Sequence, residues 1–577
     1  MDRILTAATV ITMDPDLPRA EAVAVSGDRI VGVGTVDQCR AALPGAEVID
    51  TGAAALLPGF IDSHSHPVLG GTAVMPPAYW VAPWFAPTWD DVLAAFQKAI
   101  AENDENAPLG FFGYDGLLQQ HEEPDADLLD SIFGDRLVFV FGNSGHSAYV
   151  TTAVLRALGW VENPPADPVA GSYGRRADGS LNGRALEVQA SLAIIQPVLD
   201  AIAAAGHPLQ GAVEYYMLMS AAGITSTSEH TYKSSLQPAY EALAGVPGCP
   251  LRITLYHMST EPDAAEPFVS SAPETMLHKG GIKLWADGSV WVGNIAQSSP
   301  YLDTDATRAA GITAGPTGEK DMNYSREQLD ELLDRYAGTG WQMAIHVNGD
   351  VALDVVLDAY SRALDRQRLL GTDHRWRVEH IGGARADQFP RLASLGVVPS
   401  MGPFQFYYWG DLLEGGLFDP AVGSRWQPFR DAFNAGLPVS FHNDGSVTPP
   451  SPLLNIQTAV TRRTSSGALH GASQATTLDE ALRAETINAA RALRTDDRVG
   501  SIEVGKLADF VLLGADPFEV DPRTIGTIEV LGTWLGGEAI DLDAFAQASG
   551  QVDVEGLEHL HRMGIESHAA HAHGPAL

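Results

Sequence analysis

Two histidines and an aspartate stand where an apolar run of the sequence ends. The stretch GFIDSHSHP, residues 59–67, contains Asp62, His64 and His66. In a β-strand, side chains at i and i+2 point to the same face, about 7 Å apart, so these three residues share one side. Two imidazoles placed in this way can hold one metal cation between them. The alternative is an ordinary turn after a strand, and the choice depends on whether further ligands lie nearby.

Four more residues of suitable chemistry lie in short apolar segments. Lys283 lies inside one segment. His346, His380 and Asp444 lie at or near the carboxyl ends of three others. Each has a plain alternative role: His346 as a packed polar residue, Lys283 as an ion-pair partner and Asp444 as the cap of the following segment. Together with His64 and His66 they predict a metal site if the fold brings them together.

The segments that carry these residues alternate with amphipathic helical patterns such as REQLDELLDRYAG and DVALDVVLDAYSRALDRQ. Short apolar strands that alternate with helices indicate a parallel sheet, and eight such units form a TIM (β/α)8 barrel, an α/β fold whose active site lies at the carboxyl ends of the strands. That end is where the candidate ligands would converge. The strand candidates are residues 56–62, 223–229, 251–257, 282–288, 341–347, 377–382, 397–402 and 438–444.

The barrel accounts for only part of the chain. Residues 1–56 and 485–545 both read as short strands and hairpins, which predicts a small β-sandwich built from both chain ends around a barrel domain at 57–484. An insertion of about residues 67–222, with helices and the strand LVFVFG, follows the first barrel strand. The insertion and the loop at 293–324 are candidate lids. The histidine-rich tail at 546–577 is a metal-binding segment or a disordered end, and the second reading is favoured.

Composition excludes several classes of partner. The chain of 577 residues has 72 acidic and 36 basic residues and a net charge of -36, so it repels nucleic acid and anionic membranes. Its two cysteines, Cys39 and Cys249, cannot build a disulfide framework or a cysteine-rich zinc site. The first residues do not form a signal peptide, and no apolar run is long enough to span a bilayer. We expect a cytoplasmic protein with a small-molecule substrate.

The combined motifs resemble the amidohydrolase superfamily, and in particular its amidohydrolase family 3 branch, which includes N-substituted formamide deformylases. The resemblance covers about residues 1–540. The matching stretches are PGFIDSHSHP, SGHSAYV, GIKLWADGSV, AIHVNGDVALD, RVEHIGG, FHNDGSVTPPSPL and GSIEVGKLADFVLL.

This resemblance implies that His64 and His66 bind a divalent metal, usually zinc. It implies that His346 and His380 bind a second metal or, in a one-metal enzyme, a metal and the substrate. Lys283 would be a carbamate that bridges two metals, because an unmodified ammonium is a poor ligand. A bound metal would lower the pKa of its water to about 7 and polarise a substrate carbonyl.

Within the same resemblance, Asp444 would be a metal ligand and would also move the proton from water to the leaving nitrogen. Asp62 would orient a ligand histidine or form the turn. A homodimer is a further expectation from the family.

Other residues are candidates for the substrate pocket. His146 in SGHSAYV is expected to contact the substrate or an oxyanion, and Glu187 has weaker support. His442 shares a strand face with Asp444 and either enters the site or is a buried structural histidine. Aromatic residues at 79–85 and 404–409, together with Trp285 and Trp291, line the predicted mouth or belong to the core.

The resulting hypothesis is a metal-dependent hydrolase of a non-peptide C–N bond in an amide or N-substituted formamide that carries an apolar or aromatic substituent. A second hypothesis keeps the metal but deaminates an aromatic ring or opens a cyclic amide. A third is a binding or regulatory protein that keeps the fold without catalysis. Release of ammonia rather than an amine would separate the second from the first.

Overall fold

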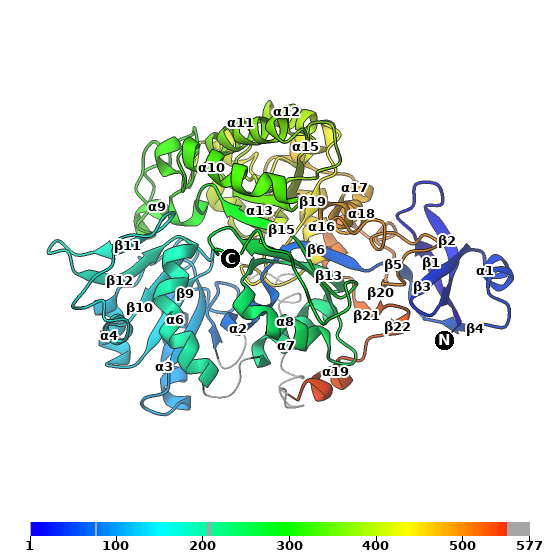
Figure 1. Cartoon of the computed structure of the whole chain (residues 1–577), viewed down its shortest axis with the longest axis horizontal. Coiled ribbons are helices and arrows are strands. Elements are labelled where there is room, and N and C mark those ends of the chain that lie inside the picture. The colour runs from blue at the N-terminus through cyan, green and yellow to red at the C-terminus, as the bar shows by residue number, and fades with distance from the viewer. Residues whose placement is uncertain (1, 75–77, 205–208, 551–577) are drawn as a thin grey trace.

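Three β-sheets organise the protein, as shown by a computed structural model that describes residues 2–74, 78–204 and 209–550 (Figure 1). A sheet built from the chain termini lies at one end, a barrel lies in the middle, and the sheet of the insertion lies at the other end. The predicted histidine-rich tail lies outside the described residues except for its first few.

The central sheet is a barrel of eight parallel strands, which confirms the predicted TIM barrel. The strands lie in the order β19-β18-β17-β16-β15-β14-β13-β6. Contacts between the first and last strands close it: the Ser63 hydroxyl donates to the Phe441 carbonyl at 2.9 Å, and Ser65 bridges to Gly445. Every predicted strand is present. Their bounds are β6 (Phe60–Ser65), β13 (Ile224–Tyr232), β14 (Arg252–Met258), β15 (Leu277–Trp285), β16 (Gln342–Val347), β17 (Arg377–His380), β18 (Val398–Met401) and β19 (Ser440–Phe441).

Apolar sequence explains these strands and their helices. All six residues of β16 are buried, as expected for a parallel strand covered on both faces. The helix α10 begins at a capping box formed by Ser325 and Gln328 and buries Leu329 and Leu333. The barrel helices include α7 (Gln210–Ala221), α8 (Gln237–Ala244), α10 (Arg326–Tyr336), α11 (Asp350–Arg366), α12 (Gln388–Leu395), α13 (Pro403–Leu413), α15 (Phe429–Asn434), α16 (Pro452–Thr461), α17 (Leu478–Ala484) and α18 (Ile487–Ala492).

Both chain ends meet in one sheet, but the predicted β-sandwich is not confirmed. Among the described residues, hydrogen bonds link eight strands into one mixed sheet in the order β22-β21-β20-β5-β1-β2-β3, with β4 beside β1. The chain passes directly from β5 in this sheet to β6 in the barrel. The strands are β1 (Arg3–Ile11), β2 (Arg19–Ser26), β3 (Arg29–Gly34), β4 (Glu47–Asp50), β5 (Ala55–Pro58), β20 (Phe510–Leu513), β21 (Val530–Leu535) and β22 (Glu538–Ala539).

The insertion after β6 has a sheet of its own, where the sequence indicated a single strand. Among the described residues, six strands lie in the order β11-β12-β10-β9-β8-β7, and α6 (Val188–Ala204) packs against four of them, β8, β9, β10 and β12. The strands are β7 (Tyr79–Trp80), β8 (Leu109–Tyr114), β9 (Val138–Gly142), β10 (Ser147–Val150), β11 (Ser172–Arg175) and β12 (Leu181–Leu186). The described helices are all too short or too polar to cross a membrane.

Candidate active site

The predicted ligands converge on one cavity at the carboxyl ends of the barrel strands. The sheet register sets Trp285 beside His346 and Val347 beside His380, which aligns these strand ends. The cavity has a volume of about 720 Å³, including its opening to solvent. Its wall contains eight of the predicted residues: His64, His66, His146, Lys283, Trp285, His346, His380 and Asp444.

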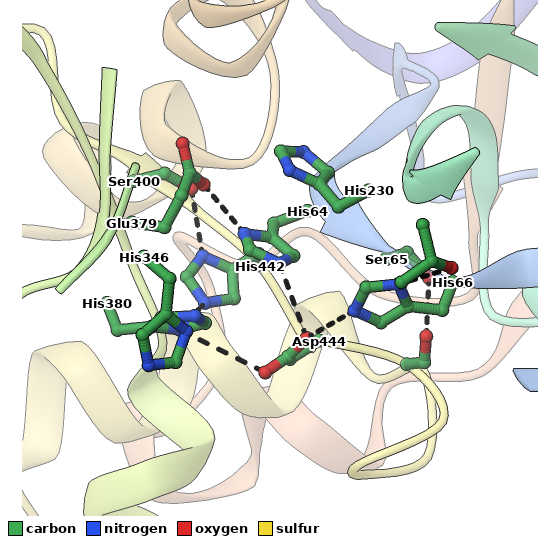
Figure 2. A network of polar contacts seen from close by, with 12 residues as sticks. His64, Ser65, His66, His230, His346, Glu379, His380, Ser400, His442 and Asp444 are labelled. Carbon is green, nitrogen blue, oxygen red and sulfur yellow. Dashed lines mark hydrogen bonds and ion pairs between the residues drawn. The ribbon is translucent and has the colours of Figure 1, made fainter. Parts of the chain in front are cut away.

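Two carboxylates that the sequence reading missed, Glu379 and Glu229, hold the first histidine pair; Figure 2 shows the first of them, Glu379, beside His64. His64 Nδ1 lies 2.7 Å from Glu379 Oε2, and His66 Nδ1 lies 3.3 Å from Glu229 Oε1. Each contact leaves Nε2 facing Asp444 Oδ1, at 3.5 Å from His64 and 3.3 Å from His66. A carboxylate on one ring nitrogen fixes the tautomer and presents the other nitrogen as a ligand.

Both carboxylates are themselves held by buried donors. Glu379 accepts a hydrogen bond from Arg377 at 2.8 Å, and neither residue is exposed to solvent. Glu229 accepts hydrogen bonds from the Tyr240 hydroxyl and from Thr231 at 2.6 Å each. Buried hydrogen bonds therefore fix the two carboxylates that orient the histidine pair.

Asp444 is the only carboxylate on the cavity wall in the part of the chain that the structure describes. Its backbone N–H donates to the carbonyl of His64 at 3.1 Å, which fixes it across from the histidine pair. Burial alone would raise the pKa of Asp444, but the hydrogen bond and charge of His66 hold it below the usual value. The side chain is therefore an ionised proton acceptor at neutral pH.

Asp62 has a different place from the histidines that follow it. It does not line the cavity, and its Oδ1 accepts from the backbone N–H groups of His64 and Asn443 at 3.3 and 3.2 Å. Burial raises the pKa of Asp62 to about 7. The residue ties β6 to the loop after β19, so it orders the backbone that carries His64 and Asp444.

Lys283 lies next to His64 of the histidine pair. Its Nζ is 3.2 Å from His64 Nε2, and the residue is almost completely buried. Burial lowers the pKa of Lys283 to about 8, even though Glu379 and Asp444 favour the charged form. Its amine therefore loses its proton far more easily than that of an exposed lysine.

His346 and His380 complete the cluster. His346 Nε2 contacts the Gly288 carbonyl at 2.9 Å, and the His346 and His380 rings lie 4.6 Å apart. Burial lowers the pKa of His64, His346 and His380 well below the ordinary value. These three imidazoles are neutral at pH 7, which is the form that binds cations.

His442 lies behind this cluster and does not line the cavity. Its Nε2 is 3.1 Å from His380 Nδ1, and its Nδ1 is 2.9 Å from the Ser400 hydroxyl. Ser400 in turn is 2.9 Å from the Ser63 hydroxyl, which donates to the Phe441 carbonyl. A carbonyl can only accept, so each group in this series of hydrogen bonds donates toward the Phe441 carbonyl. Ser63 therefore accepts from Ser400, and Ser400 accepts from His442 Nδ1–H. His442 Nε2 then accepts from His380 Nδ1–H. His380 then keeps its lone pair on Nε2.

Substitutions at residue 442 test whether its role is to accept a hydrogen bond from His380. We expect His442→Gln, whose amide oxygen can replace the acceptor, to keep metal affinity within a few-fold, whereas His442→Leu lowers it by about 10–100-fold. Competition with a chromogenic chelator measures both. The control is His374→Leu, which removes another buried histidine whose partners are the Leu395 carbonyl and the Trp376 N–H. Equal metal affinities for the Gln and Leu variants at 442 would contradict this role.

Three site residues hold a backbone conformation that side chains disfavour. Glu187, His380 and Asp444 have φ values of 69°, 70° and 53°. Left-handed conformations in non-glycine residues cost about 1–3 kcal/mol each and persist where the surroundings enforce them. At His380 and Asp444 this conformation re-aims the side chains at and after the ends of β17 and β19, which regular strand alternation does not predict.

His146 enters the cavity from the insertion and is held by Glu187. Its Nδ1 is 2.9 Å from Glu187 Oε2, and its ring centroid is 4.7 Å from that of His346. Glu187 also accepts from Asn294 at 2.5 Å and Asn323 at 3.2 Å, which belong to the loop after β15. Burial lowers the pKa of His146, but Glu187 more than reverses this effect and raises it. The dyad joins the insertion to the barrel loop at the edge of the site.

The aromatic residues divide between the cavity and the core. Trp285 lines the cavity, whereas Trp291, Phe404 and Trp409 pack in a separate buried cluster. The ring centroids of Trp80 and Trp84 lie 6.3 Å apart, and neither residue lines the cavity. The aromatic side chains of the cavity wall include Phe112 and Phe141 of the insertion, which the sequence reading did not single out.

Comparison with known proteins agrees with this geometry. The sequence profile of the Amidohydrolase family matches residues 47–541. The chain belongs to the Amidohydrolase family. As an amidohydrolase it is a hydrolytic enzyme that acts on C–N bonds other than peptide bonds.

Similar proteins extend over nearly the whole chain. It is 29% identical to an N-substituted formamide deformylase of Arthrobacter pascens, over 93% of this chain and 97% of that protein. It is 25% identical to a putative amidohydrolase of Bacillus subtilis (strain 168), over 92% and 98%. A metal-dependent hydrolase from Pyrococcus horikoshii OT3 matches the fold with a TM-score of 0.67 and 22% identity, over 90% of this chain and 99% of that chain.

The donor set of this amidohydrolase fits a divalent cation. One atom each of His64, His66 and Asp444 lie within 4.8 Å of one another. Although burial lowers the pKa of His66, its contacts with Asp444 and Glu229 raise it to about 9. The Asp444 carboxylate thus favours a positive charge at the point where the Nε2 atoms of His64 and His66 meet, which suits a divalent cation.

Proposed function

We propose that this amidohydrolase is a metal-dependent enzyme that cleaves the C–N bond of an amide or N-substituted formamide. The observation that carries the proposal is the convergence of imidazoles, a buried lysine and one carboxylate on a single cavity. The proposed metal ligands are His64, His66, Lys283, His346, His380 and Asp444.

The ligands divide into two groups. His64, His66 and Asp444 would hold the first cation, for which we propose zinc, and His346 and His380 would hold a second. Lys283 joins the groups after its amine adds to carbon dioxide, which forms an N–C bond, releases a proton and creates an anionic carbamate. Its lowered pKa favours this step, because only the neutral amine reacts. Bound cations supply Lewis acidity, which lowers the pKa of water and polarises a carbonyl oxygen.

The protein itself handles the proton and the substrate. Asp444 accepts the proton of the attacking water and delivers it to the leaving nitrogen, which must be protonated to depart as an amine. His146 and Trp285 are proposed to contact the substrate, since both line the cavity. His442 is proposed to position His380 instead of contacting the substrate. The similarity to an N-substituted formamide deformylase supports a formamide as the first substrate to test.

Metal content of the purified protein tests the ligand set. We expect about two metals per chain by elemental mass spectrometry, falling to one or none in Lys283→Ala, and partial recovery when acetate or propionate occupies the vacated space. Lys279→Ala is the matched control, because Lys279 lies in the same strand but donates to the carbonyls of Ala264 and Glu266. One metal per chain in the unmodified protein, with the same content in Lys283→Ala, would contradict the bridge. No metal after zinc supplementation would overturn the proposed function.

A further inference from the structure

The helix α6 has two apolar stripes, where packing on a sheet requires one. Ala190, Ile194 and Val198 are completely buried, and Ile202 lies against Gly110 of β8, so this stripe packs on the sheet of the insertion. The second stripe, here called the α6 wall, faces the catalytic cavity. It consists of Val188, Leu192, Ile195 and Leu199, at helical spacings of four, three and four.

Two stacked aromatic rings continue the α6 wall. Phe112 of β8 and Phe141 of β9 lie 5.5 Å apart with planes at 30°, and both line the cavity. Leu192, Ile195, Phe112 and Phe141 are already buried in the core, and the part of each that faces the cavity is an apolar surface that a ligand could cover. From residue 188 to residue 199 the helix rises roughly 16 Å, enough to lie along an arm of six or more carbons.

Charge is distributed unevenly around the cavity. Lys283 is the only lysine or arginine that lines it in the described part of the chain, and it contacts His64 at the metal end. The α6 wall and the phenylalanine pair bring no charged side chain. A carboxylate on the substrate arm would therefore be buried without a partner, which is costly. The net charge of -36 further disfavours anionic ligands.

We propose that the substrate is an uncharged amide with an extended apolar arm that lies along the α6 wall against Phe112 and Phe141, and that arms carrying a carboxylate are rejected. This inference rests on the proposed function, because it assumes that the cavity binds an amide. It assigns substrate choice to the insertion and bond cleavage to the barrel.

Three formamides test the inference by kcat/KM: N-methylformamide, N-hexylformamide and 6-formamidohexanoate. We expect N-hexylformamide to exceed N-methylformamide by roughly several hundred-fold, since its arm has about five more methylenes and each buried methylene contributes about three- to fourfold. We expect 6-formamidohexanoate to fall at least about 100-fold below N-hexylformamide. Comparable values for the hexyl and carboxylate substrates would overturn the inference.

A charge placed on the α6 wall should reverse the preference. We expect Leu192→Arg to shift the ratio of the two long substrates toward the carboxylate by on the order of 100-fold. Ala193→Arg is the matched control, because it adds the same charge at the next, exposed position of α6 and should change the ratio less than about twofold. An equal shift in both variants would show that the overall field, and not the wall, selects substrates.

Two further measurements keep the test independent of folding and of turnover. Leu192→Ala shortens the wall without adding charge and should lower the hexyl-to-methyl ratio by about tenfold. Calorimetric binding compares N-hexylmethanesulfonamide, a neutral analogue that is not hydrolysed, with its ω-carboxylate counterpart. Tighter binding of the neutral analogue without hydrolysis of any formamide supports the wall and refutes the proposed function. Hydrolysis with equal binding of both analogues refutes the wall alone.

Discussion

Replacing Asp444 with asparagine should lower kcat by about 10²–10⁴-fold while the protein keeps its metal, because an amide oxygen can remain a ligand but cannot accept and return a proton. Asp444 is the only described carboxylate on the cavity wall, and His66 keeps its pKa below the usual value. No second carboxylate among the described residues lines the cavity to take over the proton. Steady-state kinetics and metal analysis on the same preparation measure the two quantities separately.

The control for this variant is Asp115→Asn, another buried aspartate outside the cavity. Asp115 caps the backbone N–H groups of Leu117 and Leu118 and accepts from Trp409 at 2.9 Å. Its replacement should affect the melting temperature more than kcat. If Asp444→Asn kept both its metal and the kcat of the unmodified enzyme, Asp444 would not be the proton carrier.

The barrel could be predicted because its strands are apolar on both faces. Segments such as QMAIHV need no partner information to be recognised, and each is bounded by an amphipathic helix. The predicted ligands sit at the ends of these segments, so locating the strands also located His346 and His380. Predicting the fold therefore also predicted the position of these ligands.

The supporting residues were harder to predict because they act across long sequence separations. Glu229 and Glu379 look like ordinary charges in their strands, yet they contact histidines 163 and 315 positions away. The left-handed backbone at His380 and Asp444 also leaves no signal in strand alternation. Patterns within a strand indicate which face of the sheet a residue lies on, but they do not indicate which side chain of another strand it contacts.

The terminal sheet and the insertion show a related limit. Strand patterns at both chain ends correctly indicated that the termini associate, but a count of strands does not tell whether they form one sheet or two facing sheets. In the insertion, β7 and β10 have only two and four residues, too few to show a period. Long-range pairing forms these strands, so the sequence predicts a single strand where the described residues of the insertion form six.

Replacing Glu379 with glutamine should be the most damaging change away from the cavity wall. The substitution leaves the Arg377 guanidinium buried without a counter-charge, which should cost about 3–5 kcal/mol of stability. It also weakens the contact that orients His64, so metal affinity should fall by about 10–100-fold. Denaturant unfolding of the metal-free protein and chelator competition measure the two effects.

A second substitution separates these effects. In Arg377→Met/Glu379→Gln both charges are gone, so much of the stability should return, because a neutral pair carries no unpaired buried charge. The metal affinity should stay low, since the carboxylate that holds His64 Nδ1 is still missing. Asp509→Asn is the control, because it breaks a buried pair with Arg252, at 2.7 Å, outside the cavity. It should lower stability and leave metal affinity unchanged. If Glu379→Gln and Asp509→Asn bound metal equally well, Glu379 would support only the fold.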